Sequence, residues 1–288
     1  MKIKKLFILI CFISFICTSW RFATKGFRPH KIFNLRNLKD SYKDIKPPEK
    51  IDKILNQKYK YLNKGSQLYV FASEDKKYVI KFISSNKYKE PFRRNILSLL
   101  PINFKNYRKT KKINRERNLK NAINSYLISY NYLKKETGTI YIHLKNRKIF
   151  KKKLTIIDNV GSSYNININS KFFIIQKKAE KLKPKILKII KDKNKEELKK
   201  IVLDYFNLSF SIVKKGFINK DSSIKNIGYI DEELIEMDLG RFVKIKSPNF
   251  YENLKKYTFL NKKFFEKNSP DIIKFFEKNL KNYENKIY

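Results

Sequence analysis

The stretch GFINKDSSIKNIGYIDEELIEMDLGRF, residues 216–242, carries the most information about this chain. It contains Asp221, an asparagine five residues later at Asn226, and the tripeptide Asp238-Leu239-Gly240. Of the eleven Asp in the chain, only Asp221 has an Asn at that spacing, and only Asp238 begins an Asp-x-Gly. Two short apolar runs between Asn226 and Asp238 flank a polar turn, which predicts a tight pair of β-strands.

This order of residues resembles the catalytic segment of the protein-kinase-like superfamily. The resemblance implies that Asp221 is catalytic and accepts or orients the proton of an attacking hydroxyl group. It also implies that Asn226 and Asp238 hold the Mg²⁺ that accompanies ATP, because Mg²⁺ prefers a few hard oxygen ligands. Gly240 would let the backbone turn sharply after the metal ligand.

The N-terminal half of the chain extends the resemblance. In the superfamily, a glycine-bearing strand pair covers the phosphates and a following strand carries a lysine in a V-A-I-K pattern. Here the corresponding segments are KGSQLYVF, residues 64–71, and Tyr78-Val79-Ile80-Lys81. The resemblance implies that Gly65 and Ser66 contact the nucleotide. Lys81 would contact the phosphates and take part in catalysis, which would explain a lysine within an apolar strand.

Two further features of the superfamily have counterparts. Glu116 is the only acidic residue between Glu90 and Glu136, and it lies on an expected helix. The resemblance implies that Glu116 forms an ion pair with Lys81 and so supports the nucleotide site; a solvated helix acid is the alternative. The buried strand that leads into the second lobe would be residues 172–176.

The chain also departs from the superfamily pattern. The phosphate loop retains one glycine, with Gln67 and Val70 where more glycines are usual, and Asn219-Lys220 replaces the His-Arg before the catalytic aspartate. Few residues follow Gly240, so a long activation segment and a full substrate-binding lobe cannot both be present. The chain is therefore more similar to atypical and small-molecule kinases, and it looks like an atypical bacterial branch of the superfamily.

Hydrophobic patterning predicts an α+β protein with two lobes. We expect an antiparallel sheet plus one helix in the first lobe and a reduced, mostly helical second lobe. Strands are expected at residues 61–73, 77–83, 139–144, 153–158, 172–176, 227–229 and 234–237, and helices at 51–59, 111–136, 184–191 and 195–215. The expected domains are a signal peptide or anchor (1–19), a basic linker with a short helix (20–60), an N-lobe (61–178) and a C-lobe (179–288).

The N-terminus has the pattern of a secretory signal peptide. Three lysines precede the apolar run LFILICFISFIC, residues 6–17, and small residues follow it, with cleavage expected after Ser19. Twelve apolar residues fall short of the roughly 20 that a spanning helix needs. A signal anchor that stays in the membrane is the alternative, and the basic flanks leave its orientation open. We therefore expect a secreted or membrane-associated protein. Both cysteines, Cys11 and Cys17, lie in the apolar run, so the rest of the chain can form no disulfide.

The composition excludes several classes of protein. The 288 residues include 67 Lys+Arg and 26 Asp+Glu, a net charge of +41, yet 42% of them are hydrophobic, which excludes a disordered chain. Lysine predominates over arginine, and residues with A/T-rich codons are common, so genomic bias explains most of the charge. No aromatic-rich RNA-binding motif is present, so nucleic acid is not the expected partner. The acidic exception is residues 221–241, with six acidic residues against two basic ones.

Three functional hypotheses follow. The first is an atypical kinase that binds Mg–ATP and transfers a phosphoryl group to an unknown protein or small-molecule hydroxyl. The second is a pseudokinase that uses the same fold as a binding module. The third is a polyanion or membrane-surface binder that uses the basic run at residues 105–120, for which a solvated helix face is the simpler interpretation.

Overall fold

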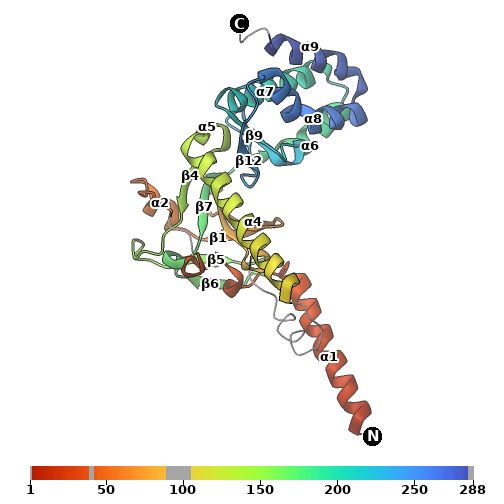
Figure 1. The fold of residues 1–288 in the computed structure, drawn as a ribbon. Helices are drawn as coiled ribbons and strands as arrows, with labels where there is room; N and C mark the ends of the chain where they lie inside the picture. The colour runs from red at the N-terminus through yellow and green to blue at the C-terminus, as the bar shows by residue number, and fades with distance from the viewer. Residues whose placement is uncertain (1, 39–41, 89–104, 285–288) are drawn as a thin grey trace. The chain divides into compact units, whose positions relative to one another are not determined.

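The computed structural model describes residues 2–38, 42–88 and 105–284 (Figure 1). The chain forms two units, each described separately below. Unit 1 comprises Met1–Arg115 and Tyr141–Ile175, and unit 2 comprises Glu116–Ile140 and Gln176–Tyr288. The expected α+β class with two lobes is confirmed. The boundaries differ from the expected 61–178 and 179–288, because residues 1–60 belong to unit 1 and residues 116–140 pack with unit 2.

Unit 1 contains most of a sheet of seven strands within the described residues, in the order β4-β7-β3-β2-β1-β5-β6. The strands are β1 (Tyr59–Lys64), β2 (Leu68–Ser73), β3 (Tyr78–Ile83), β4 (Thr139–His143), β5 (Leu154–Ile157), β6 (Ser163–Ile166) and β7 (Phe173–Lys177). β-Branched and aromatic residues dominate them, as strands favour. The turn residues Asp75 and Lys76 between the two expected strands 61–73 and 77–83 predict a hairpin, which is confirmed, since β2 and β3 pair antiparallel. The sheet is not purely antiparallel, because β1 also pairs parallel with β5.

The segment expected to be a linker is part of the core of unit 1. Phe27, Ile32 and Phe33 are buried, and the ring of Phe27 packs edge-on against Tyr69 and Phe71. Isolated bridges pair Ile32 with Ser84 and Asn34 with Lys171. The linker expectation rested on polar and basic composition, whereas these few apolar side chains fix the segment. The expected short helix is present as α2 (Ile51–Leu55).

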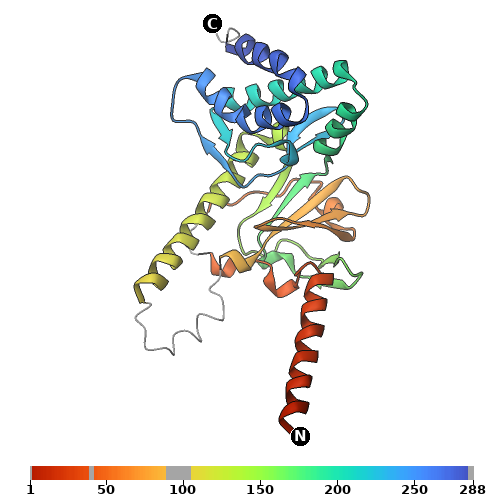
Figure 2. The same cartoon turned by 90° about the vertical axis from the view of Figure 1, so that its right-hand side faces the viewer.

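The N-terminal helix α1 (Lys2–Ala23) is longer than the apolar run that predicts it. Of the described residues, Lys4–Ala23 form one helix that is long and apolar enough to cross a membrane, and none of its most apolar window is buried within the protein. Figures 1 and 2 both show α1 running away from the sheet of unit 1. Its 22 residues span about 33 Å at 1.5 Å per residue, which matches a hydrocarbon core of about 30 Å.

Unit 2 is mostly helical with two small sheets. Its helices are the second part of α4 (Lys105–Asn131), then α5 (Lys134–Thr137), α6 (Leu182–Lys191), α7 (Lys195–Lys214), α8 (Phe250–Asn268) and α9 (Ile273–Glu284). Its strands are β8 (Glu180–Lys181), β9 (Phe217–Asn219), β10 (Ile227–Ile230), β11 (Glu233–Glu236) and β12 (Phe242–Lys244). Short 3₁₀ turns in the chain are η1 (Pro29–Lys31), η2 (Leu35–Asn37), η3 (Ser85–Lys87), η4 (Ile168–Ser170), η5 (Ile224–Asn226) and η6 (Pro270–Ile272). The core of unit 2 centres on the aromatic rings of α7. The ring centroid of Phe206 lies 4.7 Å from that of Phe276 of α9.

The single helix expected over residues 111–136 is two helices. α4 ends at Asn131, and the separate helical turn α5 ends at Thr137, followed by Gly138, which adopts a left-handed conformation (φ 63°). The helix stop at Gly138 is therefore confirmed, but the break after Asn131 is not signalled by any Gly or Pro. Pro91 and Pro101 predict an irregular stretch over residues 84–109. Residues 89–104 of this stretch lie outside the described residues, and residues 105–109 belong to α4.

Candidate functional site

Pairing of β9 with β12 brings together the two halves of the segment 216–242. Asn219 lies opposite Phe242 in this antiparallel pair, and the N–H of Lys220 donates to the carbonyl of Arg241 at 3.1 Å. Asp221 follows β9, and Asp238 precedes β12, so the pairing brings their backbones into the same region of unit 2.

Asn226 joins this region through the base of the β10–β11 hairpin. Its Nδ2 donates to the carbonyl of Asp221 at 2.8 Å, and its own carbonyl accepts the N–H of Met237 at 2.8 Å. The first bond uses the amide nitrogen, which leaves the amide oxygen as the atom of Asn226 that can bind a cation. The hairpin predicted from the sequence is confirmed, with Ile227 opposite Glu236.

Asn219 links the two expected functional aspartates. Its Oδ1 accepts the N–H of Asp221 at 3.1 Å, and its Nδ2 donates to the carbonyl of Asp238 at 3.1 Å. A single side-chain amide therefore fixes both backbones. From the sequence, Asn219 was only a departure from the superfamily pattern, although its place two residues before Asp221 could have indicated a positioning role.

Glu236 supports Asn219 from the interior of unit 2. The carboxylate is fully buried and accepts hydrogen bonds from Asn219 Nδ2 at 3.1 Å and from the hydroxyls of Ser222 and Tyr257. Burial raises the pKa of Glu236 to about 7, even though these donors favour the charged form. A buried carboxylate surrounded by donors rigidifies its neighbours. Its place between the apolar residues Ile235 and Met237, at the end of β11, is a sequence signal for this role that was missed.

The turn after Asp238 is held at both ends. The N–H of Gly240 donates to Asp238 Oδ1 at 3.1 Å, which occupies one oxygen of the carboxylate and leaves the other for a ligand. Ser125 of α4 donates to the carbonyl of Leu239 at 2.5 Å and accepts the N–H of Phe242 at 2.6 Å. Nothing in the sequence around Ser125 indicates this contact, because it depends on how α4 packs.

The structure therefore brings Asp221, Asn226 and Asp238 together in unit 2, and each is half-buried. Oxygen atoms of one carboxylate and one amide fit the preference of Mg²⁺, which usually keeps several waters and takes further ligands from phosphates. Among the described residues, no group of three or more His, Cys, Asp or Glu side chains could hold a metal ion by itself.

Lys81 lies in unit 1 on the central strand β3, as expected. It pairs with Val70 of β2 and is only 7% exposed, between the fully buried Ile80 and Phe82. Its strand lies beside β7 in the sheet order, and β7 is the strand through which the chain enters unit 2. The buried strand expected at residues 172–176 is thereby confirmed as β7.

Gly65 and Ser66 occupy the exposed turn between β1 and β2. The N–H of Gly65 donates to the carbonyl of Leu68 at 2.9 Å. A Cβ at Gly65 would meet only that carbonyl oxygen, at 3.9 Å, which is an ordinary contact. The fold of the turn itself therefore does not require a glycine.

Glu116 lies on α4, and its side chain is exposed. It is the first residue of the α4 segment assigned to unit 2, while Lys81 belongs to unit 1. The expected ion pair between Glu116 and Lys81 stays a prediction.

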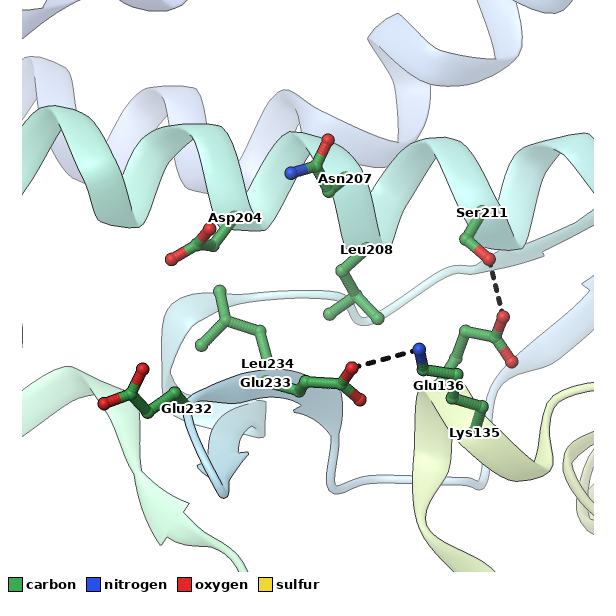
Figure 3. A pocket seen from close by; sticks show the side chains of 9 residues that line it. All are labelled: Lys135, Glu136, Asp204, Asn207, Leu208, Ser211, Glu232, Glu233 and Leu234. Atoms are coloured by element: carbon green, nitrogen blue, oxygen red, sulfur yellow. Dashed lines mark hydrogen bonds and ion pairs between the residues drawn. The ribbon is translucent and has the colours of Figure 1, made fainter.

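Unit 2 also has a hollow whose lining residues are not those of this site (Figure 3). It is lined by Lys135, Glu136, Asp204, Asn207, Leu208, Ser211, Glu232, Glu233 and Leu234. Within it, Lys135 pairs with Glu233 at 3.0 Å, and Glu136 accepts from Ser211 at 2.6 Å and from Lys215 at 2.5 Å. Burial opposes the ionisation of Glu136, but these two hydrogen bonds outweigh it and lower its pKa. These contacts pair Lys135 with Glu233 and Glu136 with Lys215.

Comparison with known proteins gives limited similarity. Neither a protein-family profile nor a curated protein sequence matches the chain. Among solved structures, the chain is similar to a co-crystal structure of WbdD with the kinase inhibitor LY294002, with 15% identity over 71% of this chain and 36% of that chain and a TM-score of 0.34. A medium-resolution structure of the bifunctional kinase-methyltransferase WbdD gives 14% identity over 69% and 33% of the two chains, with a TM-score of 0.35. The chain thus spans about a third of these proteins, and similarity at this level assigns neither family nor function.

Proposed function

We propose that this chain is a membrane-anchored, protein-kinase-like protein that binds Mg–ATP and transfers its terminal phosphoryl group to a hydroxyl acceptor. The observation that carries the proposal is the hydrogen-bond framework in which Asn219 contacts the backbones of Asp221 and Asp238 while Asn226 contacts Asp221. Three residues separated by up to 17 positions in sequence meet in one framework, as phosphoryl transfer to an alcohol would need.

In this proposal the side chains divide the work between them. Asp221 orients the acceptor hydroxyl and takes its proton as the oxygen attacks the γ-phosphorus; the bond between that phosphorus and the bridging oxygen breaks, and ADP leaves. Asn226 and Asp238 would hold Mg²⁺. When bound, the metal neutralises charge on the phosphate oxygens.

Unit 1 would supply the phosphate contacts. Lys81 is a buried cation on a rigid strand, and such a group suits a phosphate ligand. Gly65 supports the proposal because nothing in the part of the protein that the structure describes requires a glycine at this position, where a Cβ would meet only one atom, at 3.9 Å. A close approach of ligand phosphates to the backbone would explain the glycine. Glu116 is proposed as the partner that orients Lys81.

The membrane anchor in this proposal is α1. Its length and apolar composition support insertion, and the buried residues that follow it tie it to unit 1. Because ATP is scarce outside cells, the proposal requires that the folded part lie on an ATP-containing side of the membrane.

The proposal is tested by thermal unfolding of the full chain in detergent, with and without Mg–ATP. Saturating ligand at about 100 times its dissociation constant stabilises a protein by about 2.7 kcal/mol, a shift of several degrees. We expect this shift in the wild type and in Asp221→Asn, but not in Lys81→Ala. Asp221→Asn should in addition abolish formation of ADP.

The control is Asp231→Asn, which makes the same chemical change at the exposed hairpin turn, where Asn tolerates the positive φ of 48°. No shift in the wild type would contradict nucleotide binding. A shift without ADP formation in any preparation would favour the pseudokinase alternative, and ADP formation that survives Asp221→Asn would remove its catalytic role.

A further inference from the structure

The C-terminal end of α1 gathers exposed aromatic and cationic side chains on unit 1. Trp20 is 48% exposed and Phe22 is 76% exposed, and both lie at the last turns of the apolar helix. Arg21 and Lys25 are exposed beside them, with Lys25 Nζ lying 4.8 Å from the ring centroid of Phe22. The sequence contains no acidic residue before Asp40 to neutralise these cations.

The end of β1 adds a third cation to the same place. A Cβ at Gly26 would lie 3.2 Å from Lys64 Nζ, so Lys64 reaches the turn that follows α1. A shallow hollow here is lined by Thr18, Arg21, Phe22, Lys25, Gly26, Tyr61, Leu62, Asn63, Lys64 and Asn159. This hollow contains three cations and no acidic side chain.

The cations of this region repel one another. Partial burial lowers the pKa of Lys31, and so do the neighbouring charges of Arg21, Arg28 and Lys64. Within the part of the chain that the structure describes, none of Arg21, Lys25, Lys31 and Lys64 forms an ion pair with an acid. The positive charge is therefore left for a ligand outside the chain.

The depth of the region in a membrane follows from α1. If α1 crosses the membrane, Trp20 in its last turns lies at the membrane–water interface, where amphipathic aromatic side chains are enriched. Arg21, Lys25 and Lys64 then lie at the depth of the lipid phosphates. Thr24 and Phe27 are buried in unit 1, so this arrangement is fixed rather than carried on a linker.

We propose that Arg21, Lys25 and Lys64 form a binding site for the phosphate group of an anionic phospholipid, with Trp20, Phe22 and Leu62 against its glycerol and upper acyl chains. Charge complementarity selects the ligand: three uncompensated cations face the phosphates, and exposed apolar side chains flank them. The inference rests on the proposed membrane anchoring but not on the proposed kinase activity.

The experiment uses Trp20, which is the only tryptophan of the chain. The full chain is placed in vesicles of phosphatidylcholine with a minor share of phosphatidylglycerol, and either lipid in turn carries brominated acyl chains that quench nearby tryptophan. We expect brominated phosphatidylglycerol to quench Trp20 well beyond its share of the bilayer. The triple variant Arg21→Gln, Lys25→Gln, Lys64→Gln should lower this preference by about 10- to 100-fold at low salt.

The matched control is Lys53→Gln, Lys58→Gln, Lys76→Gln, which removes the same charge from exposed residues at the opposite end of β1 and its neighbours. The control should keep the preference. Equal quenching by the two lipids, or an equal loss in both triple variants, would overturn the site while leaving the anchor intact. No quenching by either lipid would overturn the anchor itself.

Discussion

At the scale of single residues, Asn219 and Glu236 support the segment that carries the candidate site residues. The amide of Asn219 contacts both Asp221 and Asp238, and the carboxylate of Glu236 holds that amide in place. The sequence indicated Asp221, Asn226 and Asp238, because the resemblance to the kinase-like superfamily rests on the spacing of these residue types. It could not indicate Asn219 and Glu236 with the same force, since their roles depend on contacts made only after β9 and β12 pair.

Replacing Glu236 by Gln should destabilise unit 2. Three donors surround the carboxylate, and the NH₂ group of Gln would face at least one of them as a second donor. We expect a loss of about 1–3 kcal/mol in the free energy of unfolding, measured by denaturant titration. Glu233→Gln on the same hairpin is the control, because its pair with Lys135 is exposed and is worth about 0–1 kcal/mol. Equal losses in the two variants would contradict the role of Glu236.

The ion pair between the buried carboxylate of Glu136 and the exposed Lys215 should make stability depend on pH. The pKa of Glu136 is lowered in the folded protein, so its charged form stabilises the fold above the ordinary value of 4.5 and this contribution is lost as the pH falls below it. We expect Lys215→Met to cost about 1–3 kcal/mol at neutral pH.

The difference in the free energy of unfolding between Lys215→Met and the wild type should become smaller as the pH falls below 4.5. Denaturant unfolding at a series of pH values measures it. Lys135→Met removes one partner of an exposed pair and should show little of this effect. A difference for Lys215→Met that stays constant with pH would show that lost packing, not the ion pair, is responsible.

At the scale of elements, the sequence predicted most strands and helices but not how distant elements combine. The β2–β3 and β10–β11 hairpins follow from alternating patterns joined by turn residues, which are local signals. The parallel pairing of β1 with β5 joins residues 97 positions apart in the sequence, such as Tyr59 and Ile156, and no local pattern encodes it. The break between α4 and α5 was not predicted, because no Gly or Pro lies between Asn131 and Lys134 to signal it.

Gly228 is the glycine that the close packing of β10 requires. A Cβ there would lie 2.5 Å from the carbonyl oxygen of Glu180 on β8 and 2.8 Å from Met237 Sδ. We therefore expect Gly228→Ala to lower the free energy of unfolding by about 1–3 kcal/mol. Gly65→Ala is the control, because its Cβ would meet nothing closer than 3.9 Å. A melting temperature of Gly228→Ala as high as that of Gly65→Ala would contradict this packing.

At the scale of the whole molecule, the net charge of +41 is unevenly distributed along the chain, with one acidic stretch among basic ones. The acidic exception at residues 221–241 contains the candidate metal ligands, whereas Arg21, Lys25 and Lys64 form the proposed lipid site. The sequence identified the first of these, because acids are rare in this chain. It could not identify the second, since Lys64 reaches Gly26 only through the fold.

The anchored form of the protein should retain residues 1–19. We expect the chain to fractionate with membranes, resist extraction at alkaline pH and keep its full mass by mass spectrometry. The double variant Ile10→Lys, Phe12→Lys should release it, because a charge near the helix centre costs about 2.5–3.5 kcal/mol on insertion. A soluble form that lacks residues 1–19 would show that the segment is a cleaved signal peptide.

In the proposed function, Asn226 and Asp238 hold the magnesium ion of a bound ATP. Calorimetric titration of the full chain with ATP, in Mg²⁺ and again in a chelator, measures the contribution of this ion to binding. We predict that Mg²⁺ strengthens ATP binding by the wild type at least about tenfold, a gain of about 1.4 kcal/mol in the free energy of binding. The control Asp231→Asn should show the same gain, and Asp238→Asn should lose it. Absence of ATP binding in the wild type, or an unchanged effect of Mg²⁺ in Asp238→Asn, would contradict the account.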